Sequence, residues 1–246
     1  MSSAKRLLQN SVRGLQLHLL QNGFFSLDKG FLVYGKYHGE IYKAALKPLL
    51  IQSDEERILV DTGIGELPEQ YKRFYSVSQS TEQTLTSQLR NHQLKPQDIT
   101  AIINTHLHFD HCGNNKLFKD AKFYIQEEEF RYALSPDRFQ KNAYIQDFCE
   151  GDLDYLKTRG DWKLTEEISV VSTPGHSPGH QSVVIRNYGK TYVYCGDAAP
   201  LKENLESLNI PGVLYRADDA LHSIERLRSV KNAVFIFSHD KDQLTL

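Results

Sequence analysis

Short apolar runs recur along the chain, and several of them end at an aspartate or a histidine. Five runs rich in β-branched or aromatic residues are ILV before Asp61, AIINT before His106, VVSTPG before His176, YVYCG before Asp197 and AVFIFS before His239. Runs of this length and composition predict buried β-strands. Ligand sites in α/β proteins often lie at the carboxyl ends of strands, so the five runs predict one pocket at one edge of the sheets.

Helical spacing of apolar residues falls between these runs. The stretches 81–94, 126–134 and 217–230 predict helices. The first opens with a threonine, and the second ends at a Ser-Pro pair. The third has one apolar face, made by Ala220, Leu221, Ile224 and Leu227. Strand-rich stretches with helices between them favour sheets that are covered by helices over a pure β-sandwich.

The chain has 246 residues, which is enough for one substantial core, and we expect a single domain over residues 1–246. Its composition, 40% hydrophobic and 24% charged, is ordinary for a globular protein. A net charge of −2 with no basic block argues against nucleic acid as a partner. No segment approaches the roughly 20 apolar residues of a membrane span, so no membrane partner is expected.

The first residues are basic: Lys5, Arg6 and Arg13 precede the first acid, Asp28. Transit peptides share this pattern, but a short flexible or helical leader over residues 1–14 is the interpretation we favour. Three widely spaced cysteines form no disulfide framework: Cys112, Cys149 and Cys195. We therefore expect a reducing compartment and a cytoplasmic protein.

The segment INTHLHFDHCGN places four potential metal ligands within six positions, His106, His108, Asp110 and His111. In an extended segment, residues two apart share a face, which puts the first three of these ligands on one side. The fourth would return to the same pocket if the chain bends over residues 112–114, where Gly and Asn are turn signals. So dense a cluster predicts a metal site.

His176, Asp197 and His239 extend the candidate ligands to five imidazoles and two carboxylates. Such donors are typical of catalytic sites, whereas structural zinc sites are rich in cysteine. One ion cannot use seven ligands, but two ions that share a carboxylate can, and each keeps room for water. The sequence therefore predicts two divalent metal ions per chain. Zinc is the ion we expect, with iron, manganese or cobalt as alternatives.

Three neighbouring residues have weaker assignments. His180 lies in the same loop as His176 but opens the next strand, so we expect it to have a structural or supporting role. Asp61 is equally compatible with a turn residue and with a hydrogen-bond acceptor for a ligating histidine. Cys112 has no free histidine base beside it, so we expect it to be a packing residue rather than a nucleophile.

These motifs resemble the metallo-β-lactamase superfamily. HLHFDH matches the HxHxDH signature, ILVDTG precedes it, and STPGHSPGHQS, GDA and FSHD follow in the family's order. The similarity runs from about residue 15 to 240. It implies an α/β (α+β) fold, a four-layer αββα sandwich with a dinuclear centre at one edge of its two sheets.

The resemblance also implies how the ligands divide between two ions. One ion would be held by three histidines, His106, His108 and His176. The other would be held by Asp110, His111 and His239. Asp197 would bridge the two ions.

Within the superfamily, the chain is most similar to the N-acyl homoserine lactone lactonases, which quench quorum sensing. This likeness predicts a hydrolase for small-molecule lactones or esters, in which a metal-bridging hydroxide attacks the carbonyl and Asp110 shuttles a proton. One departure is Pro200, where many of these lactonases carry a tyrosine that contacts the substrate carbonyl. Tyr215 and Tyr34 are candidate substitutes.

Other functions remain open on the same ligand set. A phosphodiester or organophosphate hydrolase would want Arg or Lys beside the metals, and Lys116 and Lys202 are the ones near in sequence. Another ester or a thioester is a further alternative, and a non-enzymatic metal-binding sensor is a third. The resemblance leaves the oligomeric state open, a homodimer included.

Overall fold

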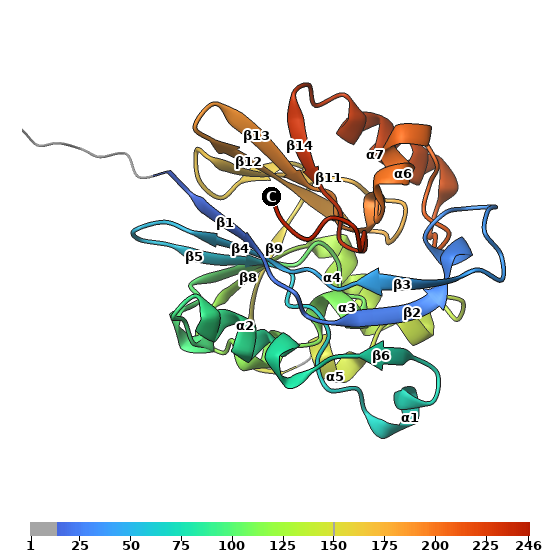
Figure 1. Cartoon of the computed structure of the whole chain (residues 1–246), viewed down its shortest axis with the longest axis horizontal. Coiled ribbons are helices and arrows are strands. Elements are labelled where there is room, and N and C mark those ends of the chain that lie inside the picture. Colours follow the sequence, from blue (N-terminus) through green and yellow to red (C-terminus); the bar gives the residue numbers. More distant parts are fainter. Residues whose placement is uncertain (1–13, 150) are drawn as a thin grey trace, which may run out of the picture.

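Two β-sheets lie face to face in the computed structural model of the chain, which describes residues 14–149 and 151–246 (Figure 1). In sheet order, the first comprises β1 (Gln16–Leu19), β4 (Leu49–Gln52), β5 (Arg57–Val60), β7 (Ala101–Ile103), β8 (Lys122–Gln126) and β9 (Asp154–Thr158). The second comprises β10 (Trp162–Lys163), β11 (Ile168–Ser172), β12 (Gln181–Asn187), β13 (Lys190–Tyr194) and β14 (Ala233–Ile236). A smaller third sheet comprises β3 (Ile41–Ala45), β2 (Phe24–Asp28) and β6 (Ser76–Ser78). The expected leader over residues 1–14 lies, except for Gly14, outside the described residues.

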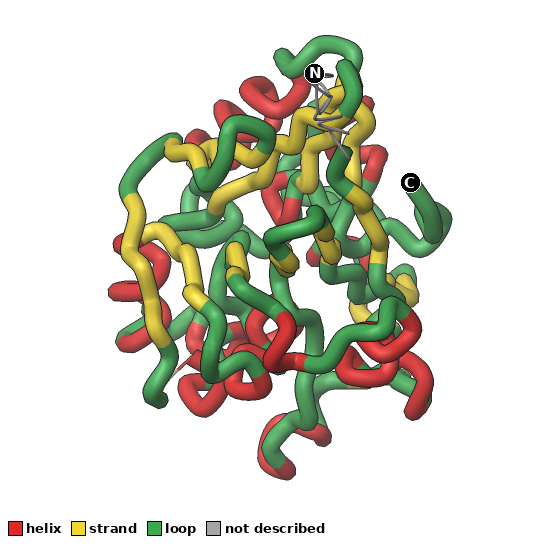
Figure 2. Tube along the Cα trace, turned by 90° about the vertical axis from the view of Figure 1, so that its left-hand side faces the viewer, coloured by secondary structure: helices red, strands yellow, loops and turns green. Residues whose placement is uncertain are grey.

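Helices lie outside the two large sheets, as the turned view of Figure 2 also shows. They are α1 (Glu69–Lys72), α2 (Leu85–Asn91), α3 (Phe109–Cys112), α4 (Glu127–Leu134), α5 (Gln146–Cys149), α6 (Lys202–Ser207) and α7 (Ala217–Arg228). Short 3₁₀ turns occur at Lys29–Phe31, Thr81–Gln83, Pro96–Asp98, Asn115–Leu117, Lys141–Ala143 and Gly196–Ala198. The three helices expected from the sequence are confirmed as α2, α4 and α7. Of the helices in the described part of the chain, none is long and apolar enough to cross a membrane.

Alternation of side chains along β5 shows why the first sheet is covered on both faces. Ile58 and Val60 point into the apolar cluster between the two sheets. Leu59 points the other way, into a cluster that contains Leu85 and Leu89 of α2. Residues adjacent in a strand face opposite sides of the sheet, so a run that is apolar throughout needs a covering layer on each side.

The second sheet repeats this arrangement. Val183 and Ile185 on β12 join the cluster between the sheets. Val184 between them belongs to the outer cluster, with Ile224 and Leu227 of α7. Two inner sheets with helices on both outer faces make four layers, and the predicted αββα sandwich is confirmed.

The five strands predicted to carry candidate ligands at their ends are present as β5, β7, β11, β13 and β14. β5 pairs parallel with β7, so these two strands end at the same edge of the first sheet. β13 pairs parallel with β14. β11 runs in the same direction as β13, because both are antiparallel to β12 between them. The loops after β5 and β7 therefore lie at one edge of the first sheet, and the loops after β11, β13 and β14 lie at one edge of the second.

Replacement of Ile103 tests the packing that holds β7 in place. Its side chain is fully buried between the sheets, directly before the ligand-bearing segment. We expect Ile103→Ala to lower the free energy of unfolding by about 2–5 kcal/mol, because it leaves a cavity in a packed core. Urea unfolding followed by fluorescence measures the loss. The matched control is Ile41→Ala, where the side chain is 74% exposed, and equal losses for the two variants would contradict the assignment.

Candidate metal centre

The chain leaves β7 and turns into a helix within the ligand-bearing segment. The N–H groups of His111 and Cys112 both donate to the carbonyl oxygen of His108, at 2.9 and 3.1 Å. Helix α3 therefore begins directly after His108, and Asp110 lies on it. The expectation of an extended segment with a bend after His111 is wrong, since the helical turn already brings the fourth ligand into the pocket.

Three buried histidines form the first group that could hold a metal ion: His106, His108 and His176 each offer one nitrogen, and these atoms lie within 4.8 Å of one another. Nε2 of His176 lies 3.0 Å from Nδ1 of His108. Nε2 of His106 and Nε2 of His108 are buried without a hydrogen-bond partner among the described residues. Buried polar atoms are nearly always paired, so the unpartnered Nε2 of His106 fits a bound cation. His108 instead presents Nδ1 to the group, and its Nε2 cannot reach the same ion because the two nitrogens of an imidazole diverge.

Asp110, His111 and His239 form a second such group. Nε2 of His239 lies 3.5 Å from Oδ2 of Asp110 and 3.3 Å from Nε2 of His111. His239 arrives here from the loop after β14, more than a hundred residues further along the chain. The structure thus brings together candidate ligands that the sequence could only list.

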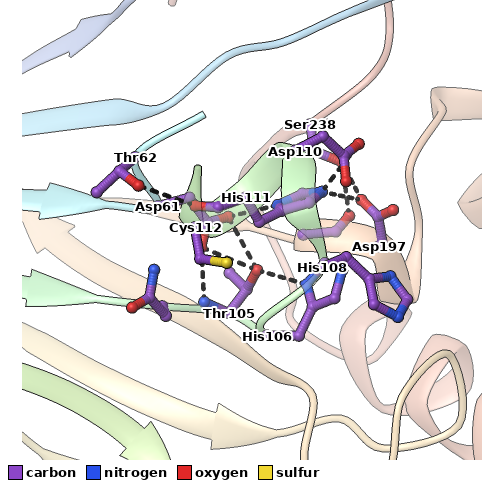
Figure 3. A network of polar contacts seen from close by, with 12 residues as sticks. Asp61, Thr62, Thr105, His106, His108, Asp110, His111, Cys112, Asp197 and Ser238 are labelled. Atoms are coloured by element: carbon purple, nitrogen blue, oxygen red, sulfur yellow. Dashed lines mark hydrogen bonds and ion pairs between the residues drawn. The ribbon is translucent and has the colours of Figure 1, made fainter. Parts of the chain in front are cut away.

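Asp197 lies between the two groups. Its Oδ1 is 3.3 Å from Nε2 of His111, and its Oδ2 is 3.2 Å from Nε2 of His239 and 3.5 Å from Nε2 of His176. Figure 3 shows the Asp197 carboxylate facing His111, with Ser238 beside it. The hydroxyl of Ser238 donates to Oδ1 at 2.6 Å and so orients the carboxylate, a contact that the sequence did not predict.

Burial and charge make the two groups electrostatically different. Burial lowers the pKa of His106 and of His108 well below the usual value, and neighbouring imidazoles add to this effect. These rings are therefore neutral at pH 7, the form that binds a metal. Burial also disfavours the charged form of His111, but Asp197 and Asp110 outweigh it and raise its pKa well above 6.5. Carboxylates thus concentrate negative charge in the second group, where they would attract a cation.

Asp61 fixes the orientation of His111. Its Oδ2 accepts a hydrogen bond from Nδ1 of His111 at 2.8 Å, and its Oδ1 accepts from the backbone N–H of Thr105 at 2.7 Å (Figure 3). A carboxylate on one ring nitrogen fixes the tautomer and leaves the other nitrogen for a metal. Of the two roles open for Asp61, the geometry supports the acceptor for a ligating histidine.

Backbone carbonyls serve two other rings in the same way. Nδ1 of His176 donates to the carbonyl of Val213 at 2.9 Å, and Nδ1 of His239 donates to that of Ala45 at 2.9 Å. In both rings, Nε2 is the atom left facing the other ligands. Sequence reasoning missed these anchors because any residue offers a carbonyl, so no side-chain signal marks them.

His180 and Cys112 have supporting places. Nε2 of His180 accepts a hydrogen bond from the backbone N–H of Asp197 at 2.9 Å, and its ring is fully buried directly before β12. This contact positions the central carboxylate, in line with the supporting role expected for His180. Cys112 is fully buried, with its sulfur 3.6 Å from that of Cys149, as expected of a packing residue.

A cavity of about 460 Å³ opens beside the two groups. His108, Asp110, His176, Asp197 and His239 line its floor. The rest of its wall is mostly apolar and includes Phe25, Phe31, Leu32, Phe74, Phe139 and Val213. A cavity with a few polar groups on one side and apolar walls elsewhere is typical of small-molecule sites.

A model of the metallo-beta-lactamase superfamily matches residues 48–239, a range that contains all seven candidate ligands. The chain belongs to the metallo-β-lactamase superfamily. It is 29% identical over 241 residues to an N-acyl homoserine lactonase of Bacillus cereus, covering 93% of this chain and 94% of that protein. It is 32% identical over 176 residues to the N-acyl homoserine lactonase AttM of Rhizobium radiobacter, covering 65% of each.

A solved N-acyl homoserine lactone hydrolase, with the product N-hexanoyl-L-homoserine at its catalytic metal centre, superposes on the chain with a TM-score of 0.83. The two are 28% identical, and the match covers 92% of this chain and 94% of the other. The superfamily and the similarity to its lactonases, both expected from the motifs, are therefore confirmed. The hydrolase AbOPH matches at a TM-score of 0.69 but 18% identity, which shows the common fold alone.

Replacement of Asp61 tests its role in holding His111. We expect Asp61→Asn to weaken zinc binding about 10–100-fold, because an amide nitrogen would face either the ring N–H or the backbone N–H of Thr105. Competition with a chromophoric chelator measures the affinity, and circular dichroism confirms the fold. If folded Asp61→Asn held zinc as tightly as the wild type, this role would be refuted.

Proposed function

We propose that this chain is a metal-dependent lactonase that opens N-acyl homoserine lactones or related lactones. The observation that carries the proposal is the cavity described above: candidate metal ligands form its floor, and its walls suit an acyl chain. Of the described residues that line it, none is an arginine or a lysine. The similarity to N-acyl homoserine lactonases over more than nine-tenths of the chain supports the same substrate class.

The cofactor we propose is a pair of divalent ions, zinc first. His106, His108 and His176 would hold one ion, while Asp110, His111 and His239 would hold the other, with Asp197 shared between them. Bound in this way, the ions would supply Lewis acidity toward a carbonyl oxygen and would lower the pKa of water toward about 7. The unpartnered Nε2 of His106 and the central carboxylate are the features that fit such a pair.

Asp110 is the residue that we assign to proton transfer. Its carboxylate lines the cavity and its side chain is 10% exposed, so it can meet both the attacking water and the substrate. As a base it holds the proton released when water attacks the lactone carbonyl. It then returns that proton to the ring oxygen as the C–O bond breaks. In a lactone this oxygen stays tethered to the product, which keeps the acceptor close to Asp110.

Pro200 lies in the cavity wall and has no side-chain donor for a substrate carbonyl. Neither of the suggested substitutes lies in that wall: Tyr34 is 59% exposed beside another hollow, and the ring of Tyr215 packs against Tyr132. Tyr75 does line the cavity. Its ring stacks on Phe109 with centroids 4.3 Å apart, and its hydroxyl donates to the carbonyl of Asn142 at 2.7 Å. We therefore assign the ring of Tyr75 to contact with the substrate. Its single hydroxyl proton is already donated to Asn142, so Tyr75 is not a replacement donor for the substrate carbonyl.

Phosphoester hydrolysis is the second candidate, since two metals also support it. A phosphate substrate would favour cationic side chains beside the metals. Lys116 and Lys202, the lysines near the motifs, do not line the cavity.

We also propose that the described sandwich is one domain, because one apolar cluster joins both sheets.

A substrate panel tests the proposed function. We expect protein with a measured zinc content to hydrolyse N-acyl homoserine lactones, with acid release read by a pH indicator and activity lost on chelation. Aryl esters, thioesters, phosphodiesters and phosphotriesters complete the panel. The proposal fails if the metallated protein ignores every lactone and cleaves a phosphoester or thioester briskly.

Replacement of Asp110 separates proton transfer from binding. Asp110→Asn keeps the volume but removes the base, so we expect kcat on a lactone to fall by ~10² or more. The measurement is made on protein loaded with excess zinc, with the zinc content checked by elemental analysis. A kcat near that of the wild type at full zinc occupancy would exclude Asp110 as the proton carrier.

A further inference from the structure

Glu129 is a buried carboxylate that the proposed reaction does not use. It lies in the first turn of α4 and its side chain is fully buried. A buried carboxylate is costly unless several donors surround it. Four donors reach Glu129, and they come from three separate segments of the chain.

Each oxygen of Glu129 accepts two hydrogen bonds. Oε1 accepts from the backbone N–H of Leu107 at 3.0 Å and from the hydroxyl of Tyr144 at 2.9 Å. Oε2 accepts from the hydroxyl of Ser177 at 2.6 Å and from the backbone N–H of Gly179 at 3.1 Å. One side chain thereby ties the loop after β7 to the loop after β11.

These donors lie beside the three histidines of the first group. Leu107 stands between His106 and His108 in the sequence, and Ser177 directly follows His176. The Tyr144 ring packs edge-on against the ring of His108, with centroids 4.6 Å apart. None of the four bonds reaches Asp110, His111 or His239, and the two histidines have anchors of their own.

We propose that Glu129 is the positioning residue that sets the spacing of His106, His108 and His176 and thereby controls binding of one ion of the pair. This rests on the proposed role of the three histidines as metal ligands. The two segments that carry them are joined through both oxygens of one carboxylate, so a change there would alter the distance between their rings. The second group would keep its geometry.

Glu129→Gln is the informative substitution. The amide keeps the volume but offers one acceptor oxygen, and its NH₂ group faces the other pair of donors. The hydroxyls of Tyr144 and Ser177 can rotate to accept from it. The backbone N–H groups of Leu107 and Gly179 cannot, and they lie on different oxygens. Either orientation of the amide therefore sets an N–H against an N–H.

Zinc content after dialysis against metal-free buffer is the first measurement. We expect about two zinc ions per chain in the wild type, from the two groups of ligands, and about one in Glu129→Gln. The matched control is Glu128→Gln, the same change one position earlier on the exposed side of α4, which should keep both ions. The inference would be overturned if Glu129→Gln kept two zinc ions per chain and a chelator removed them no more easily than from the wild type.

Double variants identify which ion is lost. In a His176→Ala background the first group is already disabled, so Glu129→Gln should remove no further zinc. In a His239→Ala background it should take the remaining zinc from about one ion per chain toward none. A general loss of stability would lower the zinc content in both backgrounds alike, and this result would also refute selective positioning.

Tyr144→Phe and Ser177→Ala extend the test if Glu129→Gln does not fold. Each removes one hydroxyl from Glu129, and each should weaken zinc retention in the first group about 10-fold or more. Wild-type retention in both variants would exclude the proposed role. Failure of the proposed function would be seen in a different experiment: the wild type itself would bind no zinc or open no lactone.

Discussion

The constraint on which this structure depends is the burial of imidazole nitrogens and carboxylates at one edge of two sheets. An unpaired buried polar atom costs about 1–3 kcal/mol, against a typical net stability of about 5–15 kcal/mol. Nε2 of His106 and Nε2 of His108 are two such atoms. Nε2 of His106 meets no proton donor among the described residues, and a cation held in the proposed site would offset its cost. The apolar clusters on both faces of each sheet supply the stability that allows such a site to form.

Hydrogen bonds to the outer ring nitrogens orient three of the candidate ligands. His111 is held by the carboxylate of Asp61, whereas His176 and His239 are held by backbone carbonyls. In each ring one nitrogen is fixed by the fold and the other faces the pocket. The anchor of His239 belongs to β3 in the small third sheet. That sheet therefore contributes to the candidate metal centre as well as to the cavity wall, which includes Phe25 on β2.

The charge and the lining of the cavity wall bear on which substrate the site can accept. A dinuclear site by itself is compatible with lactones, other esters and phosphoesters. The cavity wall favours uncharged lactones and esters over phosphoesters, since it is mostly aromatic and aliphatic and carries no arginine or lysine among its described residues. Asp110 lines the same cavity, which is why we propose that one of the candidate ligands also carries the proton.

The sequence alone determined the superfamily, the candidate ligands and the strands that end beside them, because these features are local. HLHFDH and STPGHSPGHQS are contiguous, and apolar runs identify buried strands without knowledge of their partners. The helical start at Phe109 was missed, since the hydrogen bonds that close it depend on how the loop packs. The tertiary structure alone decided which carbonyls anchor the rings, which tyrosine lines the cavity and why Glu129 is buried. Each of these depends on distances between segments far apart in the chain, and the residue types involved carry no local signal of such contacts.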